Sequence, residues 1–247
     1  MISVDHLVKD FGARRAVDDV TFEVEKGTVL GFLGPNGAGK STTMRMITGF
    51  IKPTSGTAVI DGHDIVKSPV HARSRFGYLP ESAPSYRNMT VREFLRFMAE
   101  MRGFKGPKVN AVVDGTIEKC FLEEVRNQTI ETLSKGYRQR TCFAQAILHD
   151  PPVLIMDEPT DGLDPNQKHV VREMIKEMAA EKVIILSTHV LEEVGAICNR
   201  IIIINSGKVV KDAKPAELAA EGKLEDVFRR LTQTEDTNVS KKVEVTA

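Results

Sequence analysis

The sequence predicts an α/β fold with a mainly parallel sheet, joined by an N-terminal antiparallel β-subdomain and an inserted α-helical subdomain. Three observations support this prediction. Short apolar runs at 153–156, 183–186 and 201–204 have the length of strands that are buried on both faces. Helical patterns separate these runs, which is typical of a parallel sheet. From about residue 85 to 148 the pattern is helical, with no convincing strand.

The first 33 residues are predicted to be β-structure. Val20, Phe22 and Val24 alternate with polar residues, which is the period-two pattern of a half-buried strand. An apolar run at 28–33 then leads directly into a glycine-rich loop. The order strand, glycine-rich loop, helix is the context in which a phosphate-binding loop functions.

The loop at 34–41 reads Gly-Pro-Asn-Gly-Ala-Gly-Lys-Ser and matches the G-x-x-x-x-G-K-[ST] motif. Its glycines allow a tight concavity of inward-pointing N–H groups, and the following helix adds the positive end of its dipole. Lys40 would neutralise the β- and γ-phosphates, and the Ser41 hydroxyl would ligate Mg²⁺. The sequence therefore predicts a P-loop NTPase core with a nucleoside-triphosphate site. The candidate binding residues here are Gly34, Pro35, Asn36, Gly37, Ala38, Gly39, Lys40, Ser41 and Thr42.

Two short strands are predicted at 57–60 and 76–79, after which the helical region begins. A capping box at 90–93 marks the start of its first helix. The expected apolar face of that helix consists of Val91, Phe94, Leu95, Met98 and Met101. A break at 103–107 precedes a more polar helix that is expected to run up to Phe121.

Polar side chains follow two of the buried strands. Asp157 and Glu158 close the run at 153–156, where Asp157 can hold the Mg²⁺ water shell and Glu158 can polarise an attacking water. His189 follows the run at 183–186, which should end at the same edge of the sheet. This position makes His189 a candidate sensor of the γ-phosphate.

Composition restricts the classes of partner. The 34 basic and 34 acidic residues cancel, so no overall field favours nucleic acid. The absence of Trp and the presence of only three Tyr argue against a base-stacking surface, and no nucleic-acid partner is expected. The apolar runs are too short to cross a bilayer, and no signal peptide is expected. The three cysteines share no metal-ligand spacing and are expected to be reduced thiols.

Three further motifs resemble those of ABC ATPases. Residues 133–140 read Leu-Ser-Lys-Gly-Tyr-Arg-Gln-Arg and resemble the signature motif of that family. Residues 157–164, Asp-Glu-Pro-Thr-Asp-Gly-Leu-Asp, and 187–189, Ser-Thr-His, also resemble family motifs. The resemblance covers about residues 2–215 and points to the ATP-binding subunit of an ABC transporter, in the ABC-2 or gliding-motility-type branch. Residues 224–232 also resemble the C-terminal helix of such exporter subunits.

This resemblance implies ATP and Mg²⁺ as ligands and assigns roles to individual residues. Phe11 would stack on adenine, and residues 34–41 would hold the phosphates. In the same scheme, Glu81 would occupy the Q-loop near Mg²⁺, Asp157 would support Mg²⁺, Glu158 would be the catalytic base and His189 the switch. Asp164, a predicted helix N-cap followed by Pro165, would lie in the D-loop that crosses between subunits.

The resemblance also implies partners. Ser134 and Gly136 would face the γ-phosphate of a nucleotide on a second copy of the chain, in a homodimer that sandwiches two ATP. The dimer would drive a multi-spanning permease from the cytoplasmic face of the cell membrane, and residues 82–110 would form much of the docking surface. The implied organisation is a nucleotide-binding core at 1–81 and 150–215, a helical subdomain at 82–149, and a C-terminal helix with a flexible tail at 216–247.

Three positions depart from the family pattern. Glu81 stands where glutamine is usual, although a carboxylate there can still coordinate Mg²⁺. Lys135 and Tyr137 replace the usual glycine and glutamine of the signature, while Ser134 and Gly136, which are expected to touch phosphate, are retained.

Other functions stay open at this level. The chain could be a soluble ABC-type ATPase without a transport role, or a non-catalytic nucleotide-binding module. The presence of both Glu158 and His189 argues against the second alternative. A protein that binds no nucleotide would require both phosphate-side motifs to be accidental. The sequence does not give the transported substrate, and only the branch resemblance favours export.

Overall fold

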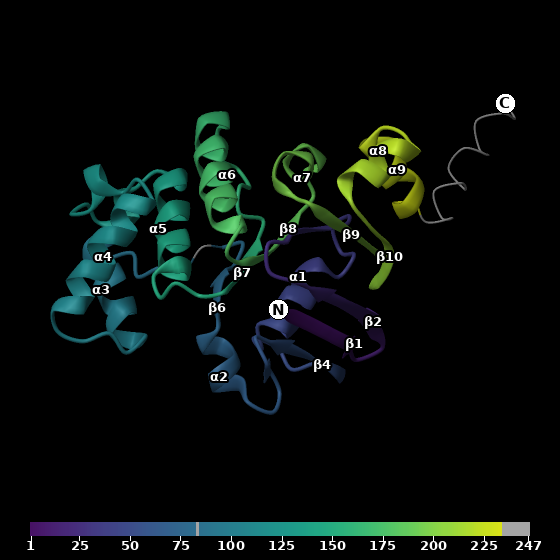
Figure 1. Ribbon diagram of the computed structural model, residues 1–247, viewed down its shortest axis with the longest axis horizontal. Helices are drawn as coiled ribbons and strands as arrows, with labels where there is room; N and C mark the ends of the chain where they lie inside the picture. The colour runs from purple at the N-terminus through teal and green to yellow at the C-terminus, as the bar shows by residue number, and fades with distance from the viewer. Residues whose placement is uncertain (83, 234–247) are drawn as a thin grey trace, which may run out of the picture.

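A computed structural model describes residues 1–82 and 84–233 and contains two β-sheets surrounded by helices (Figure 1). The smaller sheet has the strand order β2-β1-β4-β5 and consists of β1 (Ile2–Phe11), β2 (Arg14–Val24), β4 (Ser55–Ile60) and β5 (His63–Asp64). All its strand pairs are antiparallel. The predicted alternation holds in β2, where Val20, Phe22 and Val24 are buried and their neighbours are exposed.

The larger sheet has the strand order β10-β9-β3-β8-β7-β6. It consists of β3 (Val29–Leu33), β6 (Phe76–Leu79), β7 (Val153–Asp157), β8 (Val183–Thr188), β9 (Arg200–Asn205) and β10 (Lys208–Ala213). All pairs are parallel except β9 with β10. This arrangement confirms the predicted fold class.

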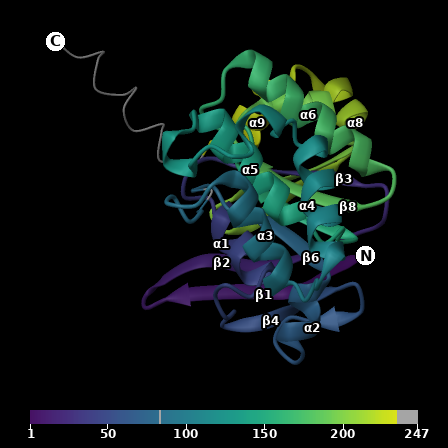
Figure 2. The same ribbon diagram turned by 90° about the vertical axis from the view of Figure 1, so that its left-hand side faces the viewer.

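Nine α-helices lie within the described residues. They are α1 (Lys40–Ile47), α2 (Pro69–Ser74), α3 (Val91–Met101), α4 (Pro107–Lys119), α5 (Lys135–Ile147), α6 (Pro165–Ala179), α7 (Leu191–Ile197), α8 (Pro215–Glu221) and α9 (Leu224–Thr232). Figure 1 shows α3, α4 and α5 gathered on the left of the molecule, away from the smaller sheet, and in Figure 2 these helices face the viewer. None of the helices in the described part of the chain is long and apolar enough to cross a membrane.

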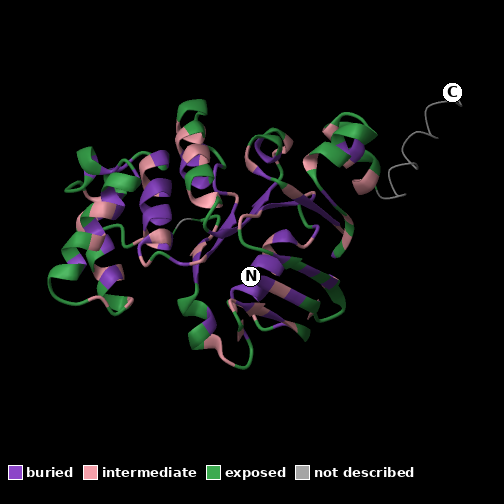
Figure 3. Ribbon diagram, in the orientation of Figure 1, coloured by how far each residue is buried: buried purple, intermediate pink, exposed green. Residues whose placement is uncertain are grey.

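The five parallel strands of the larger sheet are buried on both faces (Figure 3). On β3, Val29 and Leu33 belong to the core shared with α3–α7, whereas Leu30 and Phe32 belong to the core shared with α1 and the smaller sheet. The middle strands are therefore continuously apolar, as expected for strands covered on both sides. This double cover fixes the strand ends, on which the candidate site is built.

Helix α3 begins as predicted, whereas α4 ends at Lys119 and not at Phe121, which has a left-handed φ of 51°. The Thr90 hydroxyl and the Glu93 carboxylate form the capping box at the start of α3. Met101, which we expected on the buried face, is 69% exposed. Met101 is the last residue of α3 and lies at the edge of the apolar stripe. Ala99, on the other side of that stripe, is buried.

The C-terminal part of the sequence contains elements that the sequence patterns did not reveal. Strand β10 and helix α8 precede α9, which begins and ends as the resemblance suggested. The tail expected at the end of the 216–247 segment falls on residues 234–247, which lie outside the described residues. The three cysteines are buried, and burial raises the pKa of each thiol to about 12, so these thiols are protonated at neutral pH.

Candidate active site

The glycine-rich loop connects the end of β3 to the start of α1, and its backbone requires glycine. Gly39 has φ of 108°, and a Cβ there would lie 2.7 Å from the Ala16 carbonyl oxygen. A Cβ on Gly34 would lie 2.5 Å from the carbonyl oxygen of Ile204. Since Gly39 provides no side-chain cap, the first N–H groups of α1 remain available at the loop. The loop therefore offers backbone donors to an anion.

Lys40 supplies a buried positive charge to this loop. Its ammonium donates to the carbonyl oxygens of Gly34 at 2.7 Å and Pro35 at 3.3 Å. Burial lowers the pKa of Lys40, and the carboxylates of Glu158, Asp157 and Glu81 oppose this effect. Within the described residues Lys40 forms no ion pair. An anion entering the loop would therefore meet a cation that is held by carbonyl oxygens and not by a salt bridge.

Asp157 joins α1 to the neighbouring strands. The Ser41 hydroxyl donates to Asp157 Oδ1 at 3.3 Å, and the Ser187 hydroxyl donates to the same oxygen. The carboxylate is buried at the end of β7, where Asp157 pairs in register with Ser187 of β8. A hydroxyl and a carboxylate are the hard oxygen ligands that Mg²⁺ takes in proteins.

These donors fit Mg²⁺ that is held jointly with a phosphate. Across residues 1–82 and 84–233 no group of three or more His, Cys, Asp or Glu side chains could hold a metal. Mg²⁺ usually binds through one or two carboxylates together with substrate phosphates. Ser41 and Asp157 match that pattern.

Glu158 and His189 form the second polar pair of the site. The Nδ1 atom of His189 lies 3.0 Å from both carboxylate oxygens of Glu158. The Glu158 N–H donates to the Ser187 carbonyl oxygen at 3.1 Å, and Glu158 has φ of 51°. A left-handed conformation is rare outside glycine and is found at functional sites, where the surrounding structure holds it in place.

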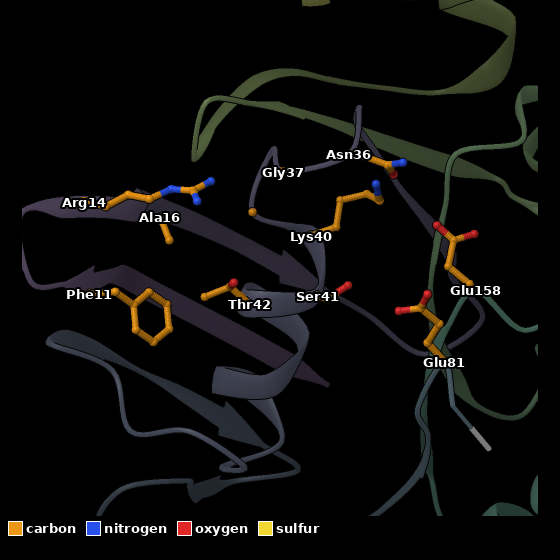
Figure 4. A pocket seen from close by; sticks show the side chains of 11 residues that line it. Phe11, Arg14, Ala16, Asn36, Gly37, Lys40, Ser41, Thr42, Glu81 and Glu158 are labelled. Atoms are coloured by element: carbon orange, nitrogen blue, oxygen red, sulfur yellow. The ribbon is translucent and has the colours of Figure 1, made fainter. Parts of the chain in front are cut away.

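A cavity of about 370 Å³ opens beside the loop (Figure 4). Of the residues singled out from the sequence, it brings together Phe11, Asn36, Gly37, Gly39, Lys40, Ser41, Thr42, Glu81 and Glu158. Phe11 is 52% exposed at one end, so it is not part of the core, and Glu81 and Glu158 lie at the other end. The ammonium of Lys9 lies 5.1 Å from the centre of the Phe11 ring.

Arg14 and Ala16 also line the cavity and were missed in the sequence. Arg14 pairs in register with Phe11 across the β1–β2 hairpin, and Figure 4 shows its guanidinium directed toward the glycine-rich loop. The available indication in the sequence was that Arg14 lies close to the turn that follows Phe11. The pattern alone did not show that Arg14 shares the cavity.

Ser134, Gly136 and Asp164 do not line this cavity. Ser134 caps α5, and its hydroxyl accepts a hydrogen bond from the N–H of Tyr137. Asp164 caps α6 by accepting from the Gln167 N–H at 3.0 Å. A Cβ on Gly136 would lie 2.1 Å from Gln167 Oε1, so the starts of α5 and α6 are packed together.

Glu81 lies between this helical region and the glycine-rich loop. It is exposed and lines both the nucleotide-sized cavity and a second cavity of about 310 Å³, which Lys135, Arg138 and Gln139 also line. The Gln139 amide donates to the Pro159 carbonyl oxygen at 3.0 Å, just beyond Glu158. The residue at position 81 can therefore respond to both regions.

Comparisons with known proteins agree with this arrangement. The family model described as "ABC transporter" matches residues 17–161. The ABC transporter ATP-binding protein NatA of Bacillus subtilis is 37% identical over 79% of this chain and 80% of its own length. The Nod factor export ATP-binding protein I of Ralstonia nicotianae is 36% identical over 88% of this chain and 68% of its own length.

Solved structures show the same fold. A structure described as the ATP binding subunit of an ABC transporter is 30% identical, with a TM-score of 0.86 over 94% of this chain and all of that one. A dimeric ATP-binding cassette bound to ADP and Pi has a TM-score of 0.79 over 87% of this chain and 98% of that one. At 23% identity, the second similarity concerns the fold alone.

Proposed function

Since this chain belongs to the ABC transporter family, we propose that it is an ATP-hydrolysing subunit that works as a dimer and drives a membrane permease. The observation that carries the proposal is the meeting of three strand ends. Leu33 of β3 is in register with Thr188 of β8, and Asp157 of β7 is in register with Ser187 of β8. The glycine-rich loop, the two carboxylates and His189 thereby lie along one edge of the sheet.

ATP would bind with its phosphates in the loop and its adenine at Phe11. The Lys40 ammonium donates to the carbonyl oxygens of Gly34 and Pro35, so a phosphate can approach it without breaking a salt bridge. The backbone N–H groups at the start of α1 would receive the remaining phosphate oxygens. Arg14, on the same side of the cavity as Phe11, adds a second cation near the loop.

Hydrolysis would use Glu158 as the general base. Its carboxylate accepts a proton from the attacking water, while the His189 ring holds the carboxylate through the contacts at 3.0 Å. The buried Lys40 ammonium stabilises negative charge that develops on the phosphate oxygens. Ser41, Asp157 and Glu81 would hold Mg²⁺, which supplies further positive charge when bound.

Each active site would be completed by a second copy of the chain. Ser134 and Gly136 lie at the start of α5, outside the cavity that holds Lys40 and Glu158. In a two-fold dimer, the α5 start of one protomer would cover the loop of its partner, and Asp164 would cross the same interface. Two equivalent sites would then form at once.

A groove beyond the C-terminal end of α1 supports the permease partner. It measures about 590 Å³ and is lined by Thr48, Gly49, Phe50, Arg73, Phe76, Tyr78, Met101 and Arg102. Phe50 is 74% exposed and Met101 is 69% exposed, and exposed apolar side chains of this kind favour a protein partner. Met101 belongs to the 82–110 segment for which docking was expected. The groove would receive a cytoplasmic segment of the permease, with this chain peripheral on the cytoplasmic face of the membrane.

The exporter assignment rests on resemblance. The motifs resemble the ABC-2 branch, and one relative is named as a Nod factor export protein. The partner would accordingly be an ABC-2-type exporter permease.

The direct test measures phosphate release from Mg·ATP by the purified chain and the membrane proteins that copurify with it. We expect ATP-dependent release that Lys40→Ala abolishes, together with one multi-spanning partner. The matched control is Lys223→Ala, which changes an exposed lysine outside the cavity and outside the 82–110 segment. Turnover without any membrane partner would instead favour a soluble ABC-type ATPase, and absence of turnover would overturn the enzymatic role.

A further inference from the structure

A charge cluster around one buried carboxylate links α6 to α7 beside the candidate active site. Glu193 of α7 is 3% exposed at its side chain, yet it faces two cations from α6. Its Oε1 lies 3.1 Å from Lys168 Nζ and 3.9 Å from Arg172 Nη2. The two cations are four residues apart and therefore share one face of α6. Figure 1 shows the two helices next to each other.

Two buried polar atoms of the cluster lack hydrogen-bond partners. Glu193 Oε1 is paired with Lys168 as an ion pair without hydrogen-bond geometry, and Arg172 Nε is buried without a hydrogen-bond partner. Burying the Glu193 carboxylate costs free energy that an ion pair need not recover, and apolar side chains of similar size often stabilise such a position equally well. Stability alone therefore does not account for three charged side chains here.

The second oxygen of Glu193 is directed to the loop that carries His189. The Thr188 hydroxyl donates to Glu193 Oε2 at 3.3 Å and accepts from the Val190 N–H at 3.0 Å. These two bonds tie the residues on both sides of His189 to one buried carboxylate. The position of the His189 backbone thus depends on where Glu193 lies.

The same cluster reaches the loop after Glu158. Helix α6 begins directly after Asp164, which ends the motif that starts at Asp157 and Glu158. Lys168 donates its N–H to the Asp164 carbonyl oxygen at 2.9 Å in the first turn. Glu193 therefore connects the helix that follows Glu158 with the loop that holds the partner of Glu158.

From these contacts we infer that Glu193 is a positioning residue, which sets His189 on Glu158 by joining Thr188 to Lys168 and Arg172. The inference rests on the proposed ATPase function and adds a residue that does not line the cavity. A change in the position of α6 would reach His189 through this carboxylate. Removing the carboxylate should slow turnover while leaving ATP binding intact.

The test compares Glu193→Gln with Glu192→Gln, since the neighbouring Glu192 is exposed. For Glu193→Gln we expect kcat to fall by about ten- to a hundredfold, because the reacting groups are misaligned, with the Kd for ATP unchanged. Glu192→Gln should match the wild type. The side-chain NMR signals of His189, assigned with His189→Gln, should shift in Glu193→Gln and not in Glu192→Gln.

A second variant separates positioning from stability. The triple change Glu193→Met, Lys168→Met and Arg172→Met replaces all three charges by apolar side chains. We expect it to melt no lower than the wild type and still to hydrolyse ATP slowly. This variant also keeps the test valid if Glu193→Gln alone unfolds.

The outcomes distinguish the two proposals. If the wild type hydrolyses ATP and the triple variant does so at the same rate, the role of Glu193 is overturned. The ATPase function would still stand. Absence of turnover in the wild type would overturn the ATPase function. If the wild type is inactive, the NMR signals of His189 still test the positioning role. Signals that are the same in Glu193→Gln and the wild type would overturn it, and shifted signals would support it.

Discussion

His189 Nδ1 lies 3.0 Å from both carboxylate oxygens of Glu158, although the two residues are 31 positions apart in the chain. They meet because β7 and β8 are parallel neighbours whose ends coincide at the edge of the sheet. The carboxylate lies at the cavity that contains Lys40, so a base and a phosphate-binding cation face the same space. This pairing is the basis of the proposed hydrolysis.

Replacing Glu158 with glutamine should remove the base and retain the shape of the site. We expect Glu158→Gln to bind ATP like the wild type and to lose turnover by about a hundred- to ten-thousandfold. The measurements are steady-state phosphate release and ATP binding, with the exposed Glu177→Gln as the control. The bound ATP should also hold the dimer closed. Turnover near the wild-type rate would remove Glu158 from the role of base.

Removing Mg²⁺ should stop hydrolysis, because Ser41 and Asp157 offer oxygen ligands that need the ion to contact phosphate. We expect EDTA to abolish turnover and excess Mg²⁺ to restore it. Ser41→Ala should raise the Mg²⁺ concentration for half-maximal turnover by about tenfold, whereas Ser55→Ala, at an exposed position, should not change it. An unchanged Mg²⁺ requirement in Ser41→Ala would exclude Ser41 as a ligand.

His149 should make the fold sensitive to acid. Burial and the nearby cations of Arg102 and Lys182 lower the pKa of His149 to about 4, and its Nε2 contacts the Phe76 carbonyl oxygen at 3.2 Å. The unfolded chain takes up this proton near pH 6.5, and the folded chain only near pH 4. Stability is therefore lost as the pH falls through this interval.

We expect the free energy of unfolding of His149→Gln to fall by about 2 kcal/mol less than that of the wild type between pH 7 and pH 4. This value is smaller than the full pKa shift would give, because the ring is partly exposed. The measurement is the free energy of unfolding from urea titrations at pH 7 and pH 4. His169→Gln, at an exposed position on α6, should retain the wild-type pH dependence. Equal pH dependence in the wild type and His149→Gln would contradict this account.

A charge placed in the apolar groove should weaken permease docking and spare nucleotide binding. We expect Phe50→Glu to reduce affinity for the permease by about tenfold or more, because it buries a carboxylate against an apolar partner. Phe121→Glu is the control, since Phe121 is 55% exposed and does not line the groove. Copurification that survives Phe50→Glu and Met101→Glu together would mean that the permease binds elsewhere.

Features that depend on local sequence were predictable. The glycine-rich loop requires residues with little steric bulk, and the strands at 153–157 and 183–188 are apolar enough to be recognised without tertiary information. Their order along the chain placed Asp157, Glu158 and His189 at strand ends. Local chemistry thus identified most residues that line the cavity.

Features that depend on tertiary contacts were not predictable. Arg14 reaches the cavity through the register of a hairpin, and Met101 is exposed because it lies where α3 ends. Strand β10 is only partly buried on one face and contains two lysines. Its hydrophobic pattern was therefore too weak to predict a strand. Glu193 is buried and Glu192 is exposed, and nothing in the sequence distinguishes these adjacent residues.

The central claim is that two copies of the chain share each ATP site, and mixing two inactive variants tests it. Lys40→Ala damages the phosphate loop and Ser134→Arg damages the α5 start, so each homodimer has two defective sites. A mixed dimer collects both changes in one site and leaves the other intact.

With complete exchange of subunits, half of the dimers are mixed and each has one intact site. Turnover should therefore return to about a quarter of the wild-type value, together with occluded nucleotide. Neither variant alone should show this recovery. If turnover and occlusion both stay absent while subunit exchange is verified independently, the two copies do not share the site.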